Sequence, residues 1–258
     1  MAKAALHLPY DNKTFIINGN ELDSSVFKPV KTKGTYEPHV MRLLKKIIRH
    51  ESVCLDIGAN IGLISLALSY LAKEGQVYSF EPSKTNFPFL VQTIEDNHIK
   101  NISPINVGVY DRNTNINFCE IGAGGGGWSF VFDETKIDAT PNEIIPCIKL
   151  DDWVQNTNVQ KVDFIKIDIE GSEIKAIQGA SNTIKKWKPD LIVEFNPIAI
   201  SDLGGAEPEE LYNMIKTAGY PSIYVLKRDN TLVKAADYST LMQLMSGGTH
   251  EDLYCSFK

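Results

Sequence analysis

The sequence predicts an α/β protein built on a mostly parallel β-sheet with helices on both faces. From residue 53 onward, short apolar runs alternate with segments whose apolar residues recur at helical spacing. The apolar runs are continuous rather than alternating, as is typical of parallel strands buried on both faces. With 258 residues, of which 43% are hydrophobic, the chain is long enough to bury such a core.

The predicted elements follow a β-α-β order. Seven strands are expected in the sheet, at residues 53–57, 76–80, 102–107, 164–167, 191–195, 222–226 and 253–257. The helices expected between them are 61–72, 83–97, 172–179 and 208–218. Ser83 is the expected N-cap of the second of these helices because its hydroxyl can accept a backbone N–H of the first turn.

Two regions depart from this order. Residues 108–147 are rich in glycine and asparagine, with strand-like stretches at 116–119 and 129–132. Ahead of the first strand, a helix is expected at 37–50, and residues 15–35 are expected to be irregular or to form short strands. We therefore expect an N-terminal lead-in over residues 1–50 and a single interrupted α/β domain over 51–258.

Composition narrows the class of partner. The net charge of −6 argues against a general nucleic-acid-binding protein, which would show a basic face. The four cysteines form no CxxC pair, so neither a zinc site nor a disulfide framework is indicated. No stretch of about 18 apolar residues and no signal peptide is found, so we expect a cytoplasmic protein that does not act at a membrane. A homo-oligomer remains open.

The turn after the first strand, in "VCLDIGANIG" (residues 53–62), is suited to a nucleoside ligand. Gly58 matches the first glycine of the dinucleotide fingerprint, but Asn60 and Leu63 occupy the positions of the other two. An acid at Asp56 would repel a pyrophosphate and attract a cationic ligand. S-adenosylmethionine (SAM) carries an ammonium and a sulfonium and no phosphate, so the turn favours SAM over NAD.

The second strand ends at Glu81, which is placed to accept hydrogen bonds from both hydroxyls of a ribose. The alternative interpretation is a carboxylate that only stabilises the next helix N-terminus. Asp56 and Glu81 together, at the ends of two successive strands, favour the nucleoside site.

Five segments resemble one known family. They are "LDIGANIG", "SFEPS", "INVGVYD", "IKLDDW" and "FIKIDIEGSEIKAIQGA", and they occur in this order between residues 34 and 197. In this combination they resemble the FkbM family of SAM-dependent methyltransferases. The resemblance implies a Rossmann-like class I methyltransferase fold with a seven-stranded sheet, and O-methylation of a small-molecule hydroxyl such as that of a sugar or a secondary metabolite.

The resemblance also implies where SAM would bind. The SAM loop would be formed by Asp56, Gly58, Asn60 and Gly62, and the ribose would be held by Glu81 and flanked by Pro82. The remaining cofactor contacts would be Val109 and Asp111 at the adenine, and Tyr36 and Glu37 closing over the cofactor. Glu37 could instead be a helix N-terminal acid and Asp111 a turn acid.

Three carboxylates follow the fourth strand in "KIDIEGSE", namely Asp168, Glu170 and Glu173. Methyl transfer is an in-line displacement, so the protein must align the acceptor and remove its proton. We expect Asp168 to be the catalytic or acceptor-positioning acid, with Glu170 and Glu173 as further candidates. Glu173 could also merely cap the following helix.

A metal site is a second hypothesis for the same sheet edge. Asp168, Glu194 and Asn196 would converge there, and Mg²⁺ prefers oxygen ligands of this kind. Glu194 and Asn196 could equally shape a metal-free acceptor pocket. His39 is expected to be an exposed helix residue.

Three points remain open from the sequence. The glycine-rich stretch 122–128 is either a hairpin tip or a flexible cover of the acceptor pocket, with Trp128 as an apolar wall. An NAD(P)-dependent oxidoreductase is an alternative function, disfavoured by Asp56 and Asn60. A non-catalytic SAM-binding protein of the same fold is another.

Overall fold

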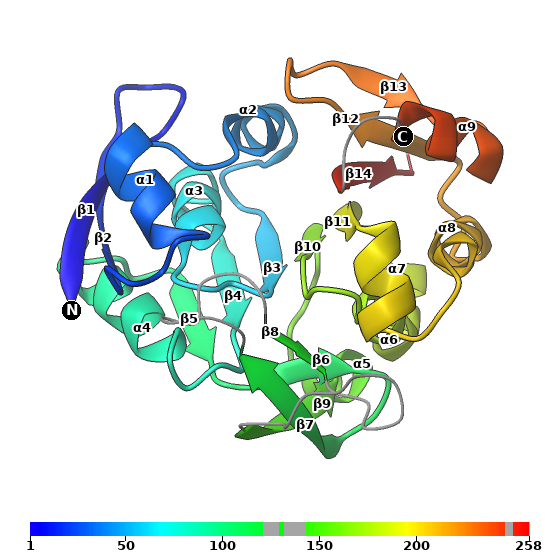
Figure 1. Cartoon of the computed structure of the whole chain (residues 1–258), viewed down its shortest axis with the longest axis horizontal. Coiled ribbons are helices and arrows are strands. Elements are labelled where there is room, and N and C mark those ends of the chain that lie inside the picture. The colour runs from blue at the N-terminus through cyan, green and yellow to red at the C-terminus, as the bar shows by residue number, and fades with distance from the viewer. Residues whose placement is uncertain (121–128, 132–142, 246–249, 258) are drawn as a thin grey trace.

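The structure is a computed structural model that describes residues 1–120, 129–131, 143–245 and 250–257. The glycine-rich stretch 122–128, including Trp128, lies outside these residues. The chain folds into a large central sheet with helices on both sides, a smaller sheet and an N-terminal hairpin (Figure 1).

The central sheet contains eight strands. In spatial order they are β13 (Leu232–Lys234), β12 (Ser222–Leu226), β14 (Glu251–Ser256), β11 (Asp190–Phe195), β10 (Phe164–Ile167), β3 (Val53–Ile57), β4 (Gln76–Phe80) and β5 (Ile102–Ile105). The pairs from β11 to β5 are parallel, whereas β14 runs antiparallel to both β11 and β12. The seven predicted strands are all present, and β13 adds an eighth through an antiparallel pairing with β12.

Two helical layers cover the sheet because its strands bury side chains on both faces. Cys54 of β3 and Phe164 of β10 belong to one core, and their neighbours Leu55 and Ile165 belong to the other. The first core is covered by α2 (Pro38–Ile47), α3 (Leu63–Leu71) and α4 (Phe87–Asp96). The second is covered by α5 (Leu150–Asn156), α6 (Glu173–Gly179), α7 (Ser181–Trp187), α8 (Pro208–Thr217) and α9 (Tyr238–Leu244). Continuous apolar strands therefore indicated this arrangement correctly.

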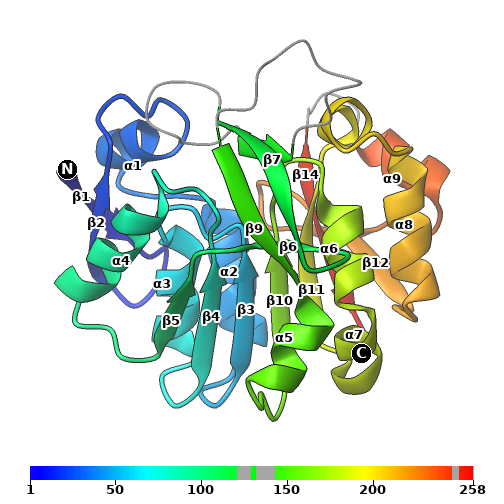
Figure 2. The same ribbon diagram turned by 90° about the horizontal axis from the view of Figure 1, so that it is seen from below.

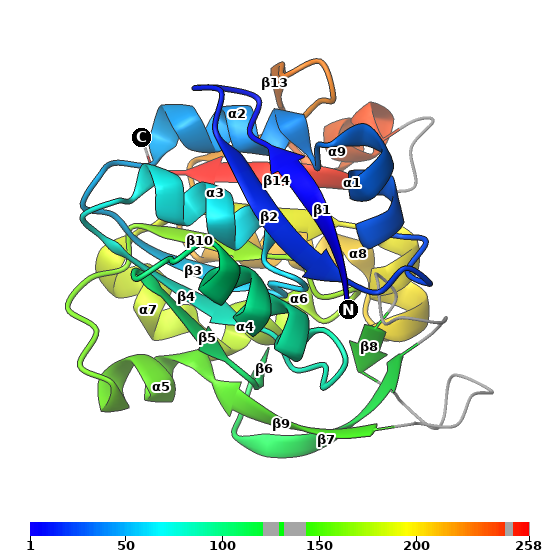
Figure 3. The ribbon, with the colours of Figure 1, turned by 90° about the vertical axis from the view of Figure 1, so that its left-hand side faces the viewer.

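The N-terminal lead-in is more regular than expected. It forms an antiparallel hairpin of β1 (Ala2–His7) and β2 (Thr14–Gly19), followed by α1 (Phe27–Lys33). The hairpin lies against α4 (Figure 3), where the Asn18 N–H donates to Thr93 Oγ1 at 3.0 Å and Asn18 Nδ2 donates to Asp96 at 2.9 Å. Its apolar residues, such as Leu6 and Phe15, belong to the same core as the buried residues of α3.

The interruption between β5 and β10 forms a second sheet of four strands. Its order is β6 (Gly108–Tyr110), β9 (Glu143–Lys149), β7 (Thr114–Glu120) and β8 (Ser129–Val131), and only β6 and β9 are parallel. Figure 2 shows this smaller sheet in front of the central one. The predicted strand-like stretches 116–119 and 129–132 correspond to β7 and β8.

Helix ends differ from the prediction in one informative place. Helix α4 begins at Phe87 rather than at Ser83, because the Ser83 hydroxyl accepts the N–H groups of Thr85 and Asn86 in a turn that precedes the helix. A short π-helix, η1 (Ala199–Leu203), follows β11. Among the described residues, none of the helices combines the length and apolar character needed to cross a membrane.

Candidate active site

A cavity of about 750 Å³ opens at the carboxyl ends of β3, β4, β10 and β11. The chain continues from β3 to β4 on one side, whereas β10 pairs with β3 on the other, so the strand order reverses between β3 and β10. Ligands of open α/β sheets bind at such a reversal. The cavity therefore lies where the sequence places the ligand.

The turn after β3 is tight and approaches β10 closely. The N–H groups of Gly58 and Ala59 both donate to the Phe80 carbonyl at 3.0 Å. Gly58 has φ +86°, and a Cβ there would lie 1.8 Å from the Asp168 carbonyl oxygen, so glycine is required. Asn60 lines the cavity with φ +51°, whereas Gly62 begins α3 and does not line it.

Asp56, at the end of β3, and Glu81, directly after β4, already have partners within the protein. Asp56 is buried, and its Oδ2 accepts the Ser65 hydroxyl at 2.5 Å. Burial raises the pKa of Asp56. Glu81 accepts the Asn60 N–H through Oε2 at 2.7 Å and the Ser83 N–H through Oε1 at 2.9 Å. Both acids line the cavity, and Glu81 is held in a fixed orientation by the backbone around it.

The smaller sheet supplies an apolar wall. Val109, Phe118, Ile145 and Cys147 line the cavity from this sheet, and Pro82 lines it from the end of β4. These side chains suit the flat, apolar face of a nucleobase.

Asp111, the predicted adenine contact, does not line the cavity. Its carboxylate pairs with Lys175 Nζ at 3.1 Å and with Arg112 Nη1 at 3.0 Å, and it lies outside the cavity lining formed by the described residues. The ion pair with Lys175 joins the smaller sheet to α6.

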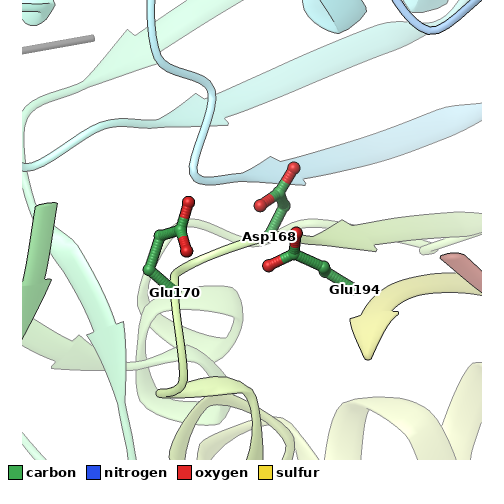
Figure 4. Close-up of side chains that lie close together, drawn as sticks. All are labelled: Asp168, Glu170 and Glu194. Carbon is green, nitrogen blue, oxygen red and sulfur yellow. The ribbon is translucent and has the colours of Figure 1, made fainter. Parts of the chain in front are cut away.

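Three carboxylates converge at the ends of β10 and β11. Each of Asp168, Glu170 and Glu194 offers an oxygen within 4.8 Å of the others, and all three line the cavity (Figure 4). Glu170 has φ +51° and is followed by Gly171 at φ +98°, so a left-handed turn brings Glu170 back toward Asp168. Burial, with the charges of Asp168 and Glu173, raises the pKa of Glu170 to about 8.

Of the two predicted ligands from the end of β11, Glu194 belongs to this cluster and Asn196 does not. Glu194 Oε2 is enclosed and has no hydrogen-bond partner among the described residues, and burial followed by the charge of Asp168 raises the pKa of Glu194 well above the usual value. Asn196 instead caps the following segment, with Oδ1 accepting the Ala199 N–H at 3.1 Å, and it does not line the cavity. Glu170 thus stands where the predicted metal set had Asn196.

Glu173 accepts hydrogen bonds from the backbone of the loop that carries Glu170. Its Oε1 accepts the N–H groups of Ile169 at 3.0 Å and Gly171 at 3.2 Å, and burial raises its pKa to about 7. It is buried and does not line the cavity. Its position is that of a residue that fixes the loop carrying Glu170.

Lys166 is a site residue that sequence reasoning missed. It is buried in β10, beside Asp56 of β3 in register, and its Nζ lies 2.6 Å from Asp168 Oδ2. Burial alone would lower its pKa, but the carboxylates of Asp168, Glu37 and Asp56 raise it well above the usual value. The signal was present, because Lys166 is the only charged residue in the apolar run "FIKI".

A second charged group lies where α2 meets the sheet. Glu37 lines the cavity beside Tyr36, has φ +36°, and encloses an Oε2 without a partner in the part of the chain that the structure describes. The expectation that His39 is exposed is wrong. His39 is buried, and its Nε2 lies 3.2 Å from Asp252 Oδ2 and 3.0 Å from Arg228 Nη1.

Comparison with known proteins supports a single family. Hexuronic acid methyltransferase AglP of Haloferax volcanii is 25% identical over 200 residues, which cover 76% of this chain and 75% of the relative. The 2-O-methyltransferase NoeI of Sinorhizobium fredii is 24% identical over 184 residues, covering 65% of this chain and 72% of the relative.

Solved structures show the same fold. A methyltransferase FkbM from Methylobacillus flagellatus matches with a TM-score of 0.50 and 18% identity over 81% of this chain, which spans 44% of that longer chain. Precorrin-6y C5,15-methyltransferase from Geobacter metallireducens matches with a TM-score of 0.50 and 11% identity over 94% of each chain. The fold is that of class I SAM-dependent methyltransferases.

The model of the methyltransferase FkbM domain matches residues 56–222, which hold the turn after β3, Glu81 and the three converging carboxylates. This match spans more than half of the sequence. The chain therefore belongs to the FkbM methyltransferase family.

Proposed function

We propose that this SAM-dependent methyltransferase methylates a hydroxyl of a sugar-like acceptor, and that the acceptor binds against Asp168, Glu170 and Glu194. The observation that carries the proposal is the convergence of these carboxylates at one end of the cavity, beside the turn that would hold SAM. A hexuronic acid methyltransferase and a 2-O-methyltransferase among the relatives support an acceptor of this class.

The cofactor would lie along the ends of β3 and β4. SAM supplies a methyl group activated by its sulfonium. Glu81, which two backbone N–H groups hold in place, would accept hydrogen bonds from the ribose hydroxyls. Val109 and Pro82 would flank the adenine. For Asp111 we propose a supporting role through its ion pair with Lys175.

On the acceptor side, we assign different roles to the three predicted acids. Asp168 Oδ2 is engaged by Lys166, which leaves Oδ1 to orient the acceptor hydroxyl. Glu170, with a pKa raised to about 8, is suited to take the hydroxyl proton near neutral pH, because a base works best when its pKa lies near the working pH. Glu173 holds the loop that carries Glu170.

A Mg²⁺ ion fits the same cluster as an alternative to Glu170 acting as the base, because a Glu170 bound to the ion would not be free to take the hydroxyl proton. Asp168, Glu170 and Glu194 offer hard oxygen ligands within 4.8 Å of one another, and the enclosed Glu194 Oε2 lacks a partner among the described residues. When bound, the ion would lower the pKa of the acceptor hydroxyl. Loss of activity after dialysis against EDTA, with recovery on adding Mg²⁺, would support this proposal; unchanged activity would contradict it.

The setting of the enzyme is consistent with a small acceptor. The net charge of −6 favours a small molecule over a nucleic acid, as expected from the sequence. The four cysteines are free and buried, which fits our proposal of a reducing, cytoplasmic location.

The decisive experiment is a methyl-transfer assay on a panel of neutral hexoses and hexuronic acids, with release of S-adenosylhomocysteine (SAH) as the readout. Asp168→Asn should lower turnover by roughly 10³-fold while SAH affinity changes less than about threefold. Asp152→Asn, on α5 and outside the cavity, is the matched control. Turnover by Asp168→Asn close to wild type would contradict the proposal, and would revive a non-catalytic role for the site.

A further inference from the structure

Opposite charges line the cavity near α2. Glu37, directly before α2, and Arg228, in the turn between β12 and β13, both line it. Figure 1 shows α2 and the turn between β12 and β13 on the opposite side of β3 and β10 from the smaller sheet. The cavity thus has an apolar end at Val109 and Phe118 and a charged end at Glu37 and Arg228.

Glu37 has a carboxylate oxygen that accepts no hydrogen bond from the described residues. Its left-handed backbone, φ +36°, is costly for a residue other than glycine, and the residue lines the cavity. Its Oε2 is enclosed and has no hydrogen-bond partner among residues with described positions. Burial and the charge of Asp252 raise its pKa to about 8, so a cationic ligand would be required to keep it ionised at neutral pH.

Arg228 is exposed, and its guanidinium contacts two imidazoles. Its Nη1 lies 3.0 Å from His39 Nε2 and its Nη2 lies 3.1 Å from His250 Nε2. His39 is in turn 3.2 Å from Asp252 Oδ2, and both of these residues are buried. The two imidazole contacts engage one N–H on each terminal nitrogen. Because a guanidinium carries five N–H donors, others remain that could donate to a ligand. His39 Nε2 cannot donate to Asp252 while it accepts from Arg228, so the two imidazoles hold the arginine and the Asp252 carboxylate acts on it through its charge.

We propose that Glu37 and Arg228 together bind the α-amino acid end of the cofactor, with Glu37 accepting from its ammonium and Arg228 donating to its carboxylate. The inference rests on the proposed function, because it requires the nucleoside end to lie at Glu81 and Val109. An acid and a guanidinium side by side match a zwitterion, whereas neither alone would. Lys166 is less suited to the carboxylate because Asp168 engages it at 2.6 Å.

The test compares two ligands that differ at this end. SAH carries the α-amino acid group, and 5′-methylthioadenosine has the same nucleoside and thioether without it. By calorimetry, Arg228→Gln should weaken SAH binding roughly 10- to 100-fold and leave methylthioadenosine within about twofold. Arg228→Lys should recover part of the loss. Arg42→Gln, an exposed arginine of α2 that contacts Asn230, is the matched control and should leave both ligands unaffected.

Glu37→Gln, which keeps the size of the side chain, gives an independent measurement. At pH 7 the wild-type protein should release close to one proton on binding SAH, seen by repeating the titration in buffers of different ionisation enthalpy. The variant should release none from this site. The charged or titratable groups that interact with Glu37, namely Tyr36, Asp252, Lys166, Asp168 and Arg228, are the same in both proteins.

The outcomes separate the possible explanations. Equal loss of SAH and methylthioadenosine in Arg228→Gln would overturn the proposal in favour of a structural role. Unchanged SAH affinity would also overturn it, and a selective loss of turnover with hexuronic acids would then assign Arg228 to an acceptor carboxylate. A wild-type protein that binds neither ligand would refute the proposed function itself.

Discussion

The carboxylates on the two sides of the cavity have different surroundings. At the ends of β3 and β4, Asp56 and Glu81 are already hydrogen-bonded to Ser65 and to the N–H groups of Asn60 and Ser83. At the ends of β10 and β11, Glu170 and Glu194 lie close to Asp168, and Glu194 Oε2 lacks a partner within the described ranges.

This difference suggests that one side of the cavity binds the cofactor and the other carries out the reaction. Acids with protein partners hold one geometry whether or not a ligand is bound, as a cofactor turn requires. Acids crowded together and shielded from water have raised pKa values, so their charge depends on pH and on what binds them. We expect substitutions on the first side to change affinity, and those on the second side to change turnover and pH dependence.

The largest effect is expected where the two sides touch. Gly58→Ala would place a Cβ 1.8 Å from the Asp168 carbonyl oxygen at φ +86°. We expect a loss of about 2–4 kcal/mol in the free energy of unfolding and of about 100-fold in SAH affinity, measured by urea denaturation and calorimetry. Gly219→Ala, at φ +97° but 3.5 Å from Phe257, is the control and should cost only about 1 kcal/mol. Equal losses would refute the proposed contact.

A pair of acid substitutions tests the separation directly. Glu81→Ala removes the acceptor for the Asn60 and Ser83 N–H groups and for the ribose, so SAH affinity should fall by about 30- to 100-fold. Glu170→Ala should change SAH affinity less than about threefold while lowering turnover by at least about 100-fold. If both variants lost SAH affinity alike, the two sides would not be separate.

Magnesium should stabilise only the acceptor side, and only when its acids are ionised. In a thermal melt at pH 8, millimolar Mg²⁺ should raise the Tm by about 2–5 °C, with little effect at pH 5 because protons then compete for Glu170 and Glu194. Glu194→Gln should abolish the increase, whereas Asp152→Asn should keep it. An equal increase at both pH values would indicate binding elsewhere.

The smallest effect concerns stability and pH. Because the folded-state pKa of Glu170 is raised to about 8, its protonated form favours the folded state, and this contribution is present below about pH 4 and is lost as the pH rises to about 8. Glu170→Gln should remove that loss and gain about 1 kcal/mol relative to wild type at pH 8 but not at pH 4, measured by urea denaturation. An equal change at both pH values would exclude ionisation as the cause.

The sheet and its ligand-binding edge could be predicted from the sequence because buried parallel strands are continuous apolar runs. Strands such as β3 and β10, and the acids that follow them, were placed correctly. The direction of individual side chains could not be predicted in the same way. Asn196 and Asp111 follow strands but turn to Ala199 and Lys175, since a position near a strand end fixes the backbone and not the partner that a side chain finds.

Glu37 was predicted as a cofactor contact, but Arg228 and the residues around it were missed for a different reason. They come from segments far apart in the sequence, with His39 in α2, Arg228 after β12 and Asp252 in β14. Only the packing of α2 against the last strands brings them together. A single histidine on an amphipathic helix carries no local sign of such a contact.

The position of β14 has a consequence for how the protein folds. This strand follows β12 and β13 in the chain but lies between β11 and β12, so the hairpin of β12 and β13 cannot join the sheet until β14 has been inserted. Pairings between such distant segments form slowly because a long loop must close first. Since β14 pairs with β12, after which Arg228 follows, we expect the parallel core to form before the cofactor site is complete, and SAH to bind only after this last step.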